Sequence, residues 1–223
     1  MKHLEIEMKT LLSEEEYDRL LAQFSEVTPV TQKNYYLDTP DFYLRHHKIA
    51  MRIRTFDTSA ELTIKIPQEV GNMEYNQDLS LEEAKNCLAQ CKLPQGMIQE
   101  ELTSRGLSTS DWVVLGCLTT VRYEKETAIG LMALDQSRYF DIVDYELELE
   151  VENGVQGSLD FKEFLQANDI HYKKAPSKLV RFIENMKKKL KLSSFFDKIE
   201  EIKNNRICER KHFPLKMFFH RFT

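Results

Sequence analysis

Cysteine is scarce in this chain of 223 residues. The four that occur lack paired CxxC spacing: Cys87, Cys91, Cys117 and Cys208. No basic and then apolar signal segment opens the sequence either. We therefore expect reduced thiols and a cytoplasmic protein, and we interpret Cys87 and Cys91, which are four residues apart on a predicted helix, as buried structural thiols.

Long apolar runs and an excess of basic residues are also missing. No run approaches the length that a membrane-spanning helix needs. The 31 Lys and Arg residues are outnumbered by 36 Asp and Glu residues, and the formal net charge of −5 argues against nucleic acid as the main partner. An acidic total can still contain a basic pocket. We expect no nucleic-acid or membrane partner, and a monomer or a homodimer.

Glycine and proline are few, at seven and six residues, and hydrophobic residues make up 42%, as in an ordinary soluble globular protein. The length is sufficient for one larger domain with a substantial core, and nothing requires a second domain. We place this domain over 1–191. The remaining 192–223 has no clean periodicity and ends in aromatic and basic residues, so we interpret it as a C-terminal extension.

Alternating apolar and polar residues predict strands, whereas capping signals and apolar stripes predict helices. The strands are expected over 3–10, 31–39, 48–56, 60–66, 112–125, 128–136 and 139–152. The helices are expected over 14–24, 80–90, 95–105, 159–166 and 178–190. Capping boxes that start at Ser13 and Ser80 mark two helix beginnings, and Ser177 after Pro176 marks a third.

Charged residues recur on one face of at least five of these strands, and the opposite face is apolar. The charged faces carry Glu5, Glu7 and Lys9; Arg52 and Arg54; Glu61 and Lys65; Arg122; and Glu146, Glu148 and Glu150. A sheet that rests on helices with its charged face in water would give this pattern. A sheet curled into a barrel with the charges inside would give it too.

The residue types bear on this choice. A solvated face would use much Lys, Gln, Ser and Thr, whereas paired Arg and paired Glu are costly to bury unless they bind one another, a metal or an anion. Guanidinium and ammonium groups suit a chain of phosphates. Glutamates would repel that anion unless a hard divalent cation such as Mg²⁺ lies between them. In a barrel, these residues therefore predict a metal and phosphate site.

Three stretches carry the signatures of one family. Glu5, Glu7 and Lys9 form an ExExK motif, QKNYYLDTPDFYLRHHKIAMRIR (32–54) looks like that family's second and third strands, and SKLVRF (177–182) is similar to its C-terminal helix motif. From Met1 to about Leu190 the chain resembles the CYTH family, also called the triphosphate tunnel metalloenzymes, and most closely its small bacterial members. The resemblance implies an α+β fold with an eight-stranded antiparallel β tunnel and flanking helices. It also implies Mg²⁺ or Mn²⁺ as the cofactor.

The resemblance further implies roles for single residues. Glu5 and Glu7 would bind the metal with two of Glu146, Glu148 and Glu150, and the ELELE run allows either register. Phosphate oxygens would be bound by Lys9, Arg52, Arg54, Lys65, Arg122, Lys178 and Arg181. Lys9 and Asp135 would be catalytic, with Asp135 near the metal or the attacking water. Glu61 is interpreted as an internal partner of a neighbouring base.

These expectations describe a metal-dependent phosphohydrolase that cleaves the terminal phosphate from inorganic triphosphate or a related triphosphate compound, with water as the nucleophile. Class IV-type adenylate cyclases and thiamine triphosphatases share the triphosphate clamp and are the alternatives within the family. A non-catalytic binder of polyphosphate or nucleotide is a further alternative. The complete acidic set argues against it, because anion binding alone needs no carboxylates.

Overall fold

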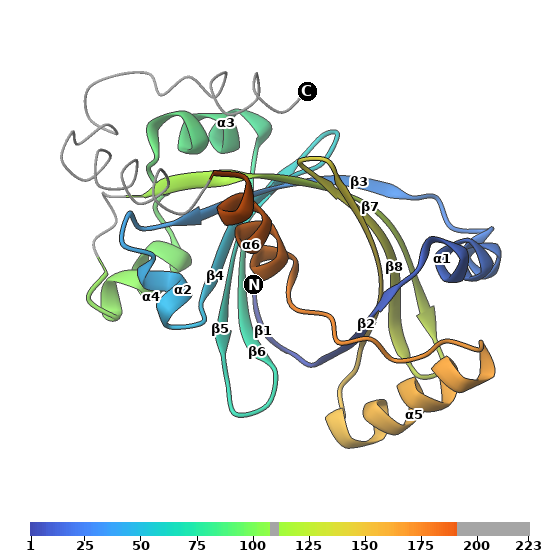
Figure 1. Cartoon of the computed structure of the whole chain (residues 1–223). Coiled ribbons are helices and arrows are strands. Elements are labelled where there is room, and N and C mark those ends of the chain that lie inside the picture. The colour runs from blue at the N-terminus through green and yellow to red at the C-terminus, as the bar shows by residue number, and fades with distance from the viewer. Residues whose placement is uncertain (108–111, 191–223) are drawn as a thin grey trace.

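One antiparallel sheet forms the centre of the molecule (Figure 1). The computed structural model describes residues 1–107 and 112–190. The strands are β1 (Lys2–Glu5), β2 (Glu7–Leu12), β3 (Val30–Asp38), β4 (Ala50–Thr55), β5 (Ala60–Pro67), β6 (Asn72–Leu79), β7 (Val113–Thr127), β8 (Gly130–Tyr139) and β9 (Ile142–Glu150). Their order in the sheet is β1-β6-β5-β4-β3-β7-β8-β9-β2. All the strands expected from alternation are present, within a few residues of their expected bounds.

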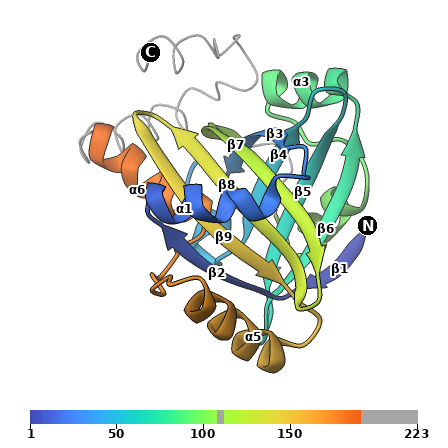
Figure 2. The same ribbon diagram turned by 90° about the vertical axis from the view of Figure 1, so that its right-hand side faces the viewer.

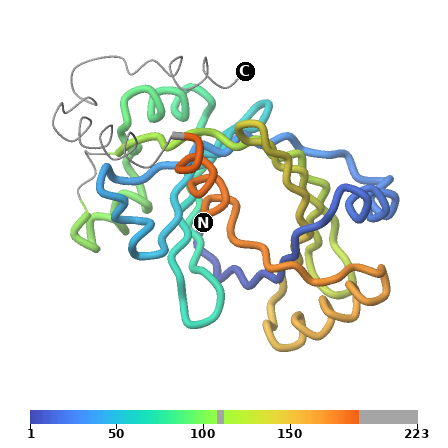
Figure 3. The backbone as a smooth tube through the Cα atoms, viewed as in Figure 1, coloured from blue at the N-terminus to red at the C-terminus, as the bar shows by residue number. Residues whose placement is uncertain are grey.

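The first strand segment closes the sheet because it pairs with both of its ends. β1 pairs with β6, where His3 lies opposite Glu74, and β2 pairs with β9, where Lys9 lies opposite Glu148. The change of partner falls at Ile6, whose carbonyl accepts a hydrogen bond from the Val151 amide at 2.9 Å. The sheet therefore curls round on itself (Figure 3). The prediction of eight strands is wrong by one, because this segment is broken in two where it passes between the sheet edges.

Strand β6 lies in a segment for which alternation predicts no strand, between Pro67 and Ser80. A tight turn joins it to β5, and the Gln68 amide donates to the Gly71 carbonyl across this turn at 3.0 Å. Gly71 has a φ of 71°, and a Cβ atom there would lie 2.2 Å from the Glu5 carbonyl oxygen. Only glycine therefore fits where this turn approaches the first strand.

Helices α1 and α3 begin at the two predicted capping boxes, in which Ser13 pairs with Glu16 and Ser80 pairs with Glu83. The helices are α1 (Glu14–Leu21), α2 (Tyr43–His46), α3 (Leu81–Gln90), α4 (Met97–Ser104), α5 (Gly154–Ala167) and α6 (Lys178–Leu190), and a 3-10 turn (Ala22–Phe24) follows α1. Helix α5 begins at Gly154 rather than at residue 159, because the Asn153 side chain caps it. The side-chain oxygen of Asn153 accepts hydrogen bonds from the backbone amides of Val155 and Gln156.

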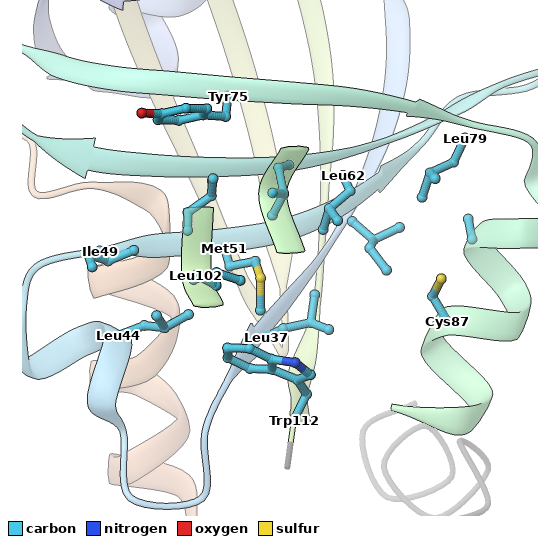
Figure 4. Packing of buried hydrophobic residues seen from close by; sticks show 14 of the residues in the cluster. Leu37, Leu44, Ile49, Met51, Leu62, Tyr75, Leu79, Cys87, Leu102 and Trp112 are labelled. Carbon is cyan, nitrogen blue, oxygen red and sulfur yellow. The ribbon is translucent and has the colours of Figure 1, made fainter. Parts of the chain in front are cut away.

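Apolar side chains on the outer face of the sheet form two cores under helices. In one, strand residues such as Leu62 pack with Leu102 of α4 and with Trp112 (Figure 4). In the other, Leu147 of β9 packs with Leu20 of α1, which crosses the outside of β8 and β9 (Figure 2). Because the apolar faces of these strands point outward to the helices, their charged faces point into the curled sheet.

Helix α6 packs on the inner face instead, within the curve of the sheet (Figure 1). The Phe182 ring lies over Gly116 of β7, where an added Cβ atom would come within 2.5 Å of Phe182 Cζ. The register between β3 and β7 shifts beside this position, after the pair Tyr36 and Gly116. The bulge and the missing side chain thus make room for the helix.

Among the described residues, Cys87, Cys91 and Cys117 form no disulfide, and Cys208 lies outside the described residues. The predicted extension over 192–223 also lies outside them, so its separation from the domain stays a prediction. Within 1–107 and 112–190, no helix is both long enough and apolar enough to cross a membrane.

Candidate active site on the inner face of the sheet

The strand register brings the predicted site residues together on the inner face, since directly opposite residues in an antiparallel pair share one face. The opposite pairs are Lys9 and Glu148, Arg54 and Glu61, Lys65 and Glu74, Arg122 and Asp135, and Asp135 and Glu146. Acidic and basic side chains therefore lie side by side on this inner face, which we call the wall. Four of these five pairs join a carboxylate to a base, so carboxylates hold the bases in place.

Lys178 enters this wall from the first turn of α6. Its Nζ atom lies 2.8 Å from Asp135 Oδ2, 3.2 Å from Glu146 Oε1 and 2.7 Å from Glu148 Oε1. One turn further along the helix, Arg181 Nη1 lies 2.5 Å from Glu146 Oε2. The helix thus brings two cations to three carboxylates of β8 and β9. The sequence predicts this helix over 178–190 and includes both cations among the candidate site residues. Burial would lower the pKa of Lys178, but these carboxylates outweigh burial and raise it.

Arg122 forms a bidentate ion pair with the fully buried Asp135. The distances are 2.8 Å from Nε to Oδ1 and 2.6 Å from Nη2 to Oδ2, and Arg122 also bonds to Glu148. Burial alone would raise the pKa of Asp135, but Arg122 and Lys178 hold it below its ordinary value. Asp135 therefore stays ionised and fixes both cations.

Lys65 links the first strand to β6. Its Nζ lies 2.5 Å from Glu5 Oε1 and 2.8 Å from Glu74 Oε2. Glu74 is 6% exposed and was not expected in the site, because the sequence did not predict β6. Burial opposes ionisation of Glu74, yet Lys65 and Arg52 lower its pKa to about 2. At Glu5 burial prevails over Lys65, so the pKa of Glu5 is raised.

The two arginines of β4 are less well neutralised. Arg54 donates from Nε to Asn34 Oδ1 at 2.9 Å, and its Nη1 lies 3.2 Å from Glu61 Oε1. Burial, together with Arg52 and Arg122 nearby, lowers the pKa of Arg54 to about 9. Arg52 makes no ion pair within the described part of the chain, and its Nε is buried without a hydrogen-bond partner there. The described carboxylates therefore do not fully neutralise the positive charge of Arg52 and Arg54, and a bound anion would complete the neutralisation.

Glu7, Lys9 and Glu150 lie at the seam between β2 and β9. Lys9 bonds to Glu7, and Glu150 lies directly opposite Glu7. The Glu150 side chain is 40% exposed, and its Oε1 is 3.9 Å from His3 Nε2. Glu150 therefore lies apart from Glu146 and Glu148, which meet at Lys178.

The carboxylates of this wall supply oxygen ligands of the kind that a hard divalent cation binds. No group of three or more His, Cys, Asp or Glu among residues 1–107 and 112–190 is arranged as a ready metal cage. However, Mg²⁺ commonly takes only one or two carboxylates and completes its shell with phosphate oxygens and water. The ammonium of Lys178 between Asp135, Glu146 and Glu148 indicates that this carboxylate set accommodates a compact cation. The donor set is all oxygen, as Mg²⁺ and Mn²⁺ prefer.

Comparisons with known proteins show to which family the chain is similar. The family model of the CYTH domain matches residues 3–183. A Bacillus subtilis protein named "Putative triphosphatase YjbK" is 35% identical over 191 residues, which cover 85% of this chain and 99% of that protein.

Solved structures agree on the fold. A Bacillus halodurans protein described as a "putative adenylate cyclase" is 34% identical, with a TM-score of 0.77 over 81% of this chain and 98% of that one. The Hippeastrum protein HpAC1, for which a dominant triphosphatase activity is described, is 23% identical, with a TM-score of 0.73 over 82% of this chain and 96% of that one. This last likeness concerns the fold alone.

Proposed function

Because the chain belongs to the CYTH domain family, we propose that it is a divalent-metal-dependent triphosphatase that hydrolyses inorganic triphosphate or a related triphosphate compound. The observation that carries the proposal is the wall itself, where carboxylates lie beside bases and Arg52 has a buried Nε without a partner in the described residues. Phosphate oxygens are the natural partners of such a guanidinium. The name of the 35% identical Bacillus subtilis protein supports the same activity.

In this proposal the cations bind and neutralise the triphosphate. They are Lys9, Arg52, Arg54, Lys65, Arg122, Lys178 and Arg181. Glu5 and Glu7, with two of Glu146, Glu148 and Glu150, would hold Mg²⁺ or Mn²⁺, which when bound neutralises phosphate charge and polarises a phosphoryl oxygen. Lys9 orients the attacking water. The full burial of Asp135 favours a role in holding Arg122 and Lys178 over direct contact with that water.

Phosphate release from tripolyphosphate, ATP, thiamine triphosphate and pyrophosphate, each with Mg²⁺ and with Mn²⁺, tests the proposal. We expect tripolyphosphate or one of the other triphosphates to be hydrolysed, and no release in the presence of EDTA. An adenylate cyclase, as the Bacillus halodurans relative is described, would form cyclic AMP from ATP instead. Tight binding without turnover of any of the four would contradict the proposal and identify a non-catalytic binder.

We also propose that the substrate is a free small molecule and that the protein acts in the cytoplasm without a nucleic-acid or membrane partner, as a monomer or a homodimer. The net charge of −5 and the small number of cysteines, which form no disulfide among the described residues, support this setting. The catalytic domain is proposed to cover 1–191, with 192–223 as an extension to it.

A further inference from the structure

A buried tyrosine lies among the cations of the inner face. Tyr36 of β3 is directly opposite Arg52 of β4, so both side chains point to the inside of the curled sheet. Tyr36 is 3% exposed, and its ring packs against that of Phe182, with 5.7 Å between the ring centroids. Helix α6 therefore holds one side of the ring while the phenol remains on the charged face.

The Tyr36 hydroxyl has no hydrogen bond within residues 1–107 and 112–190. Two other tyrosines near the sheet are satisfied: Tyr139 donates to Asp144 Oδ2 at 2.5 Å, and Tyr145 donates to Glu14 Oε1 at 2.8 Å. A hydroxyl group that has no protein partner and lies on this charged face is available to a ligand.

The surroundings indicate which kind of ligand this is. Burial raises the pKa of Tyr36, although Arg52, Lys178, Arg54 and Arg181 all act on the phenol in the opposite direction. Tyr36 is therefore a neutral hydroxyl in the field of four cations. Such a field concentrates anions, and an anion's oxygen accepts the proton that a phenol can donate.

On the premise of the proposed triphosphatase function, we infer that Tyr36 is a substrate-binding residue that donates a hydrogen bond to a phosphate oxygen held by Arg52 and Lys178. Its contribution differs from theirs because the phenol carries no charge. The cations lose attraction as salt screens them, whereas a short hydrogen bond from a neutral donor is little affected. Tyr36 also lies between α6 and β4, so it joins the two groups of cations around one phosphate group.

Tyr36→Phe and Tyr35→Phe form a matched pair for the test, because neighbouring strand residues point to opposite faces. Tyr35 packs with the outer core, away from the charged wall. Calorimetry with tripolyphosphate in EDTA, where no turnover is expected, should give a dissociation constant about 10- to 100-fold higher for Tyr36→Phe than for wild type, the loss expected for a hydrogen bond to a charged group. Tyr35→Phe should bind as wild type does.

Two further readouts separate binding from structure. The melting temperature of ligand-free Tyr36→Phe should equal that of wild type, because no described hydrogen bond is lost. At ~0.5 M salt the affinity of Tyr36→Phe should still be lower than that of wild type by the same factor. The factor by which Arg52→Ala lowers the affinity should become smaller at this salt concentration. Wild-type affinity in Tyr36→Phe, or a lowered melting temperature with unchanged affinity, would overturn the inference and leave the proposed function standing. Wild-type protein that neither binds nor hydrolyses tripolyphosphate would overturn both.

Discussion

Single side chains of the inner face differ in how fully their charge is neutralised. Arg122 has carboxylate partners in Asp135 and Glu148, whereas Arg52 has none in the described chain. The Nε of Arg52 is buried without a partner in the described residues, so Arg52 stands to gain most from a bound anion. Glu7, at the seam between β2 and β9, is the opposite case, because its carboxylate is proposed to bind a metal cation.

Glu7→Gln should weaken metal use rather than folding. The amide keeps the shape of the side chain but removes the charge that a hard cation requires. We expect the Mg²⁺ concentration for half-maximal activity to rise at least roughly 10-fold, with a large fall in turnover. Titration of activity against Mg²⁺ measures this, and the exposed Glu82→Gln in α3 is the control. Normal activity of Glu7→Gln at ordinary Mg²⁺ would remove Glu7 from the site.

Glu146 should make the stability of the metal-free protein depend on pH. Burial raises the pKa of Glu146 from its ordinary value of 4.5 to about 7, and this exceeds the opposing effect of Lys178. Between those values the folded state binds more protons than the unfolded state, so the contribution of Glu146 to stability is present below pH 4.5 and is lost as pH rises through 7.

Glu146→Gln should remove this decline, which amounts to at most roughly 3 kcal/mol. Urea unfolding in EDTA at pH 5 and pH 8 measures it for both proteins. The same difference between the two pH values in Glu146→Gln and in wild type would show that another group is responsible.

The alternation of charged and apolar residues along each strand predicts most members of this wall, because every second side chain of a strand lies on the same face of the sheet. Lys65 and Arg122 could be placed in this way. Glu74 could not be placed in this way, because the sequence predicts no strand between Pro67 and Ser80. Glu74 itself lies between the apolar residues Met73 and Tyr75. Tyr36 shares the parity of the charged face but carries no charge to mark it.

Among the elements, α6 is the helix that carries two cations, Lys178 and Arg181, into the curled sheet. Its seat depends on Gly116, which has a φ of 149° and lies under Phe182.

Gly116→Ala should therefore lower the melting temperature by roughly 3 to 10 °C through overpacking and backbone strain. It should lower turnover further, because displacement of α6 removes two cations from the wall. Gly106→Ala is the control, since Gly106 has a φ of 76° but no atom lies within 4 Å of its added Cβ. Equal losses of activity in the two variants would show that α6 does not depend on this contact.

Local signals explain which elements could be predicted. The capping boxes at Ser13 and Ser80 fix helix beginnings through contacts only three residues apart, and both predictions are confirmed. Helix α5 was expected too late because Gly154 and Gly157 disfavour a helix, and a cap at Asn153 compensates for them. Gly157 is required by close packing, since a Cβ atom there would come within 2.6 Å of Val151.

The closure of the whole molecule depends on pairings that are distant in sequence. β2 pairs with β9, and β1 pairs with β6, so the segment Lys2–Leu12 determines whether the charged face is enclosed. Strand alternation alone is equally consistent with a flat sheet in water. The pairings at the two ends of the sheet decide the matter, because they close it with the apolar face outside, under the helices, and the charged face within.

The most direct test of this enclosed face as a triphosphate site is the melting temperature with and without tripolyphosphate and Mg²⁺. A ligand that binds only the folded state at ~100 times its dissociation constant adds ~2.7 kcal/mol of stability. For a chain of this size we predict a rise of roughly 5 to 10 °C, and a much smaller rise with orthophosphate at the same concentration, because it engages only one or two of the bases. No rise with tripolyphosphate, or an equal rise with orthophosphate or with added salt, would contradict the account.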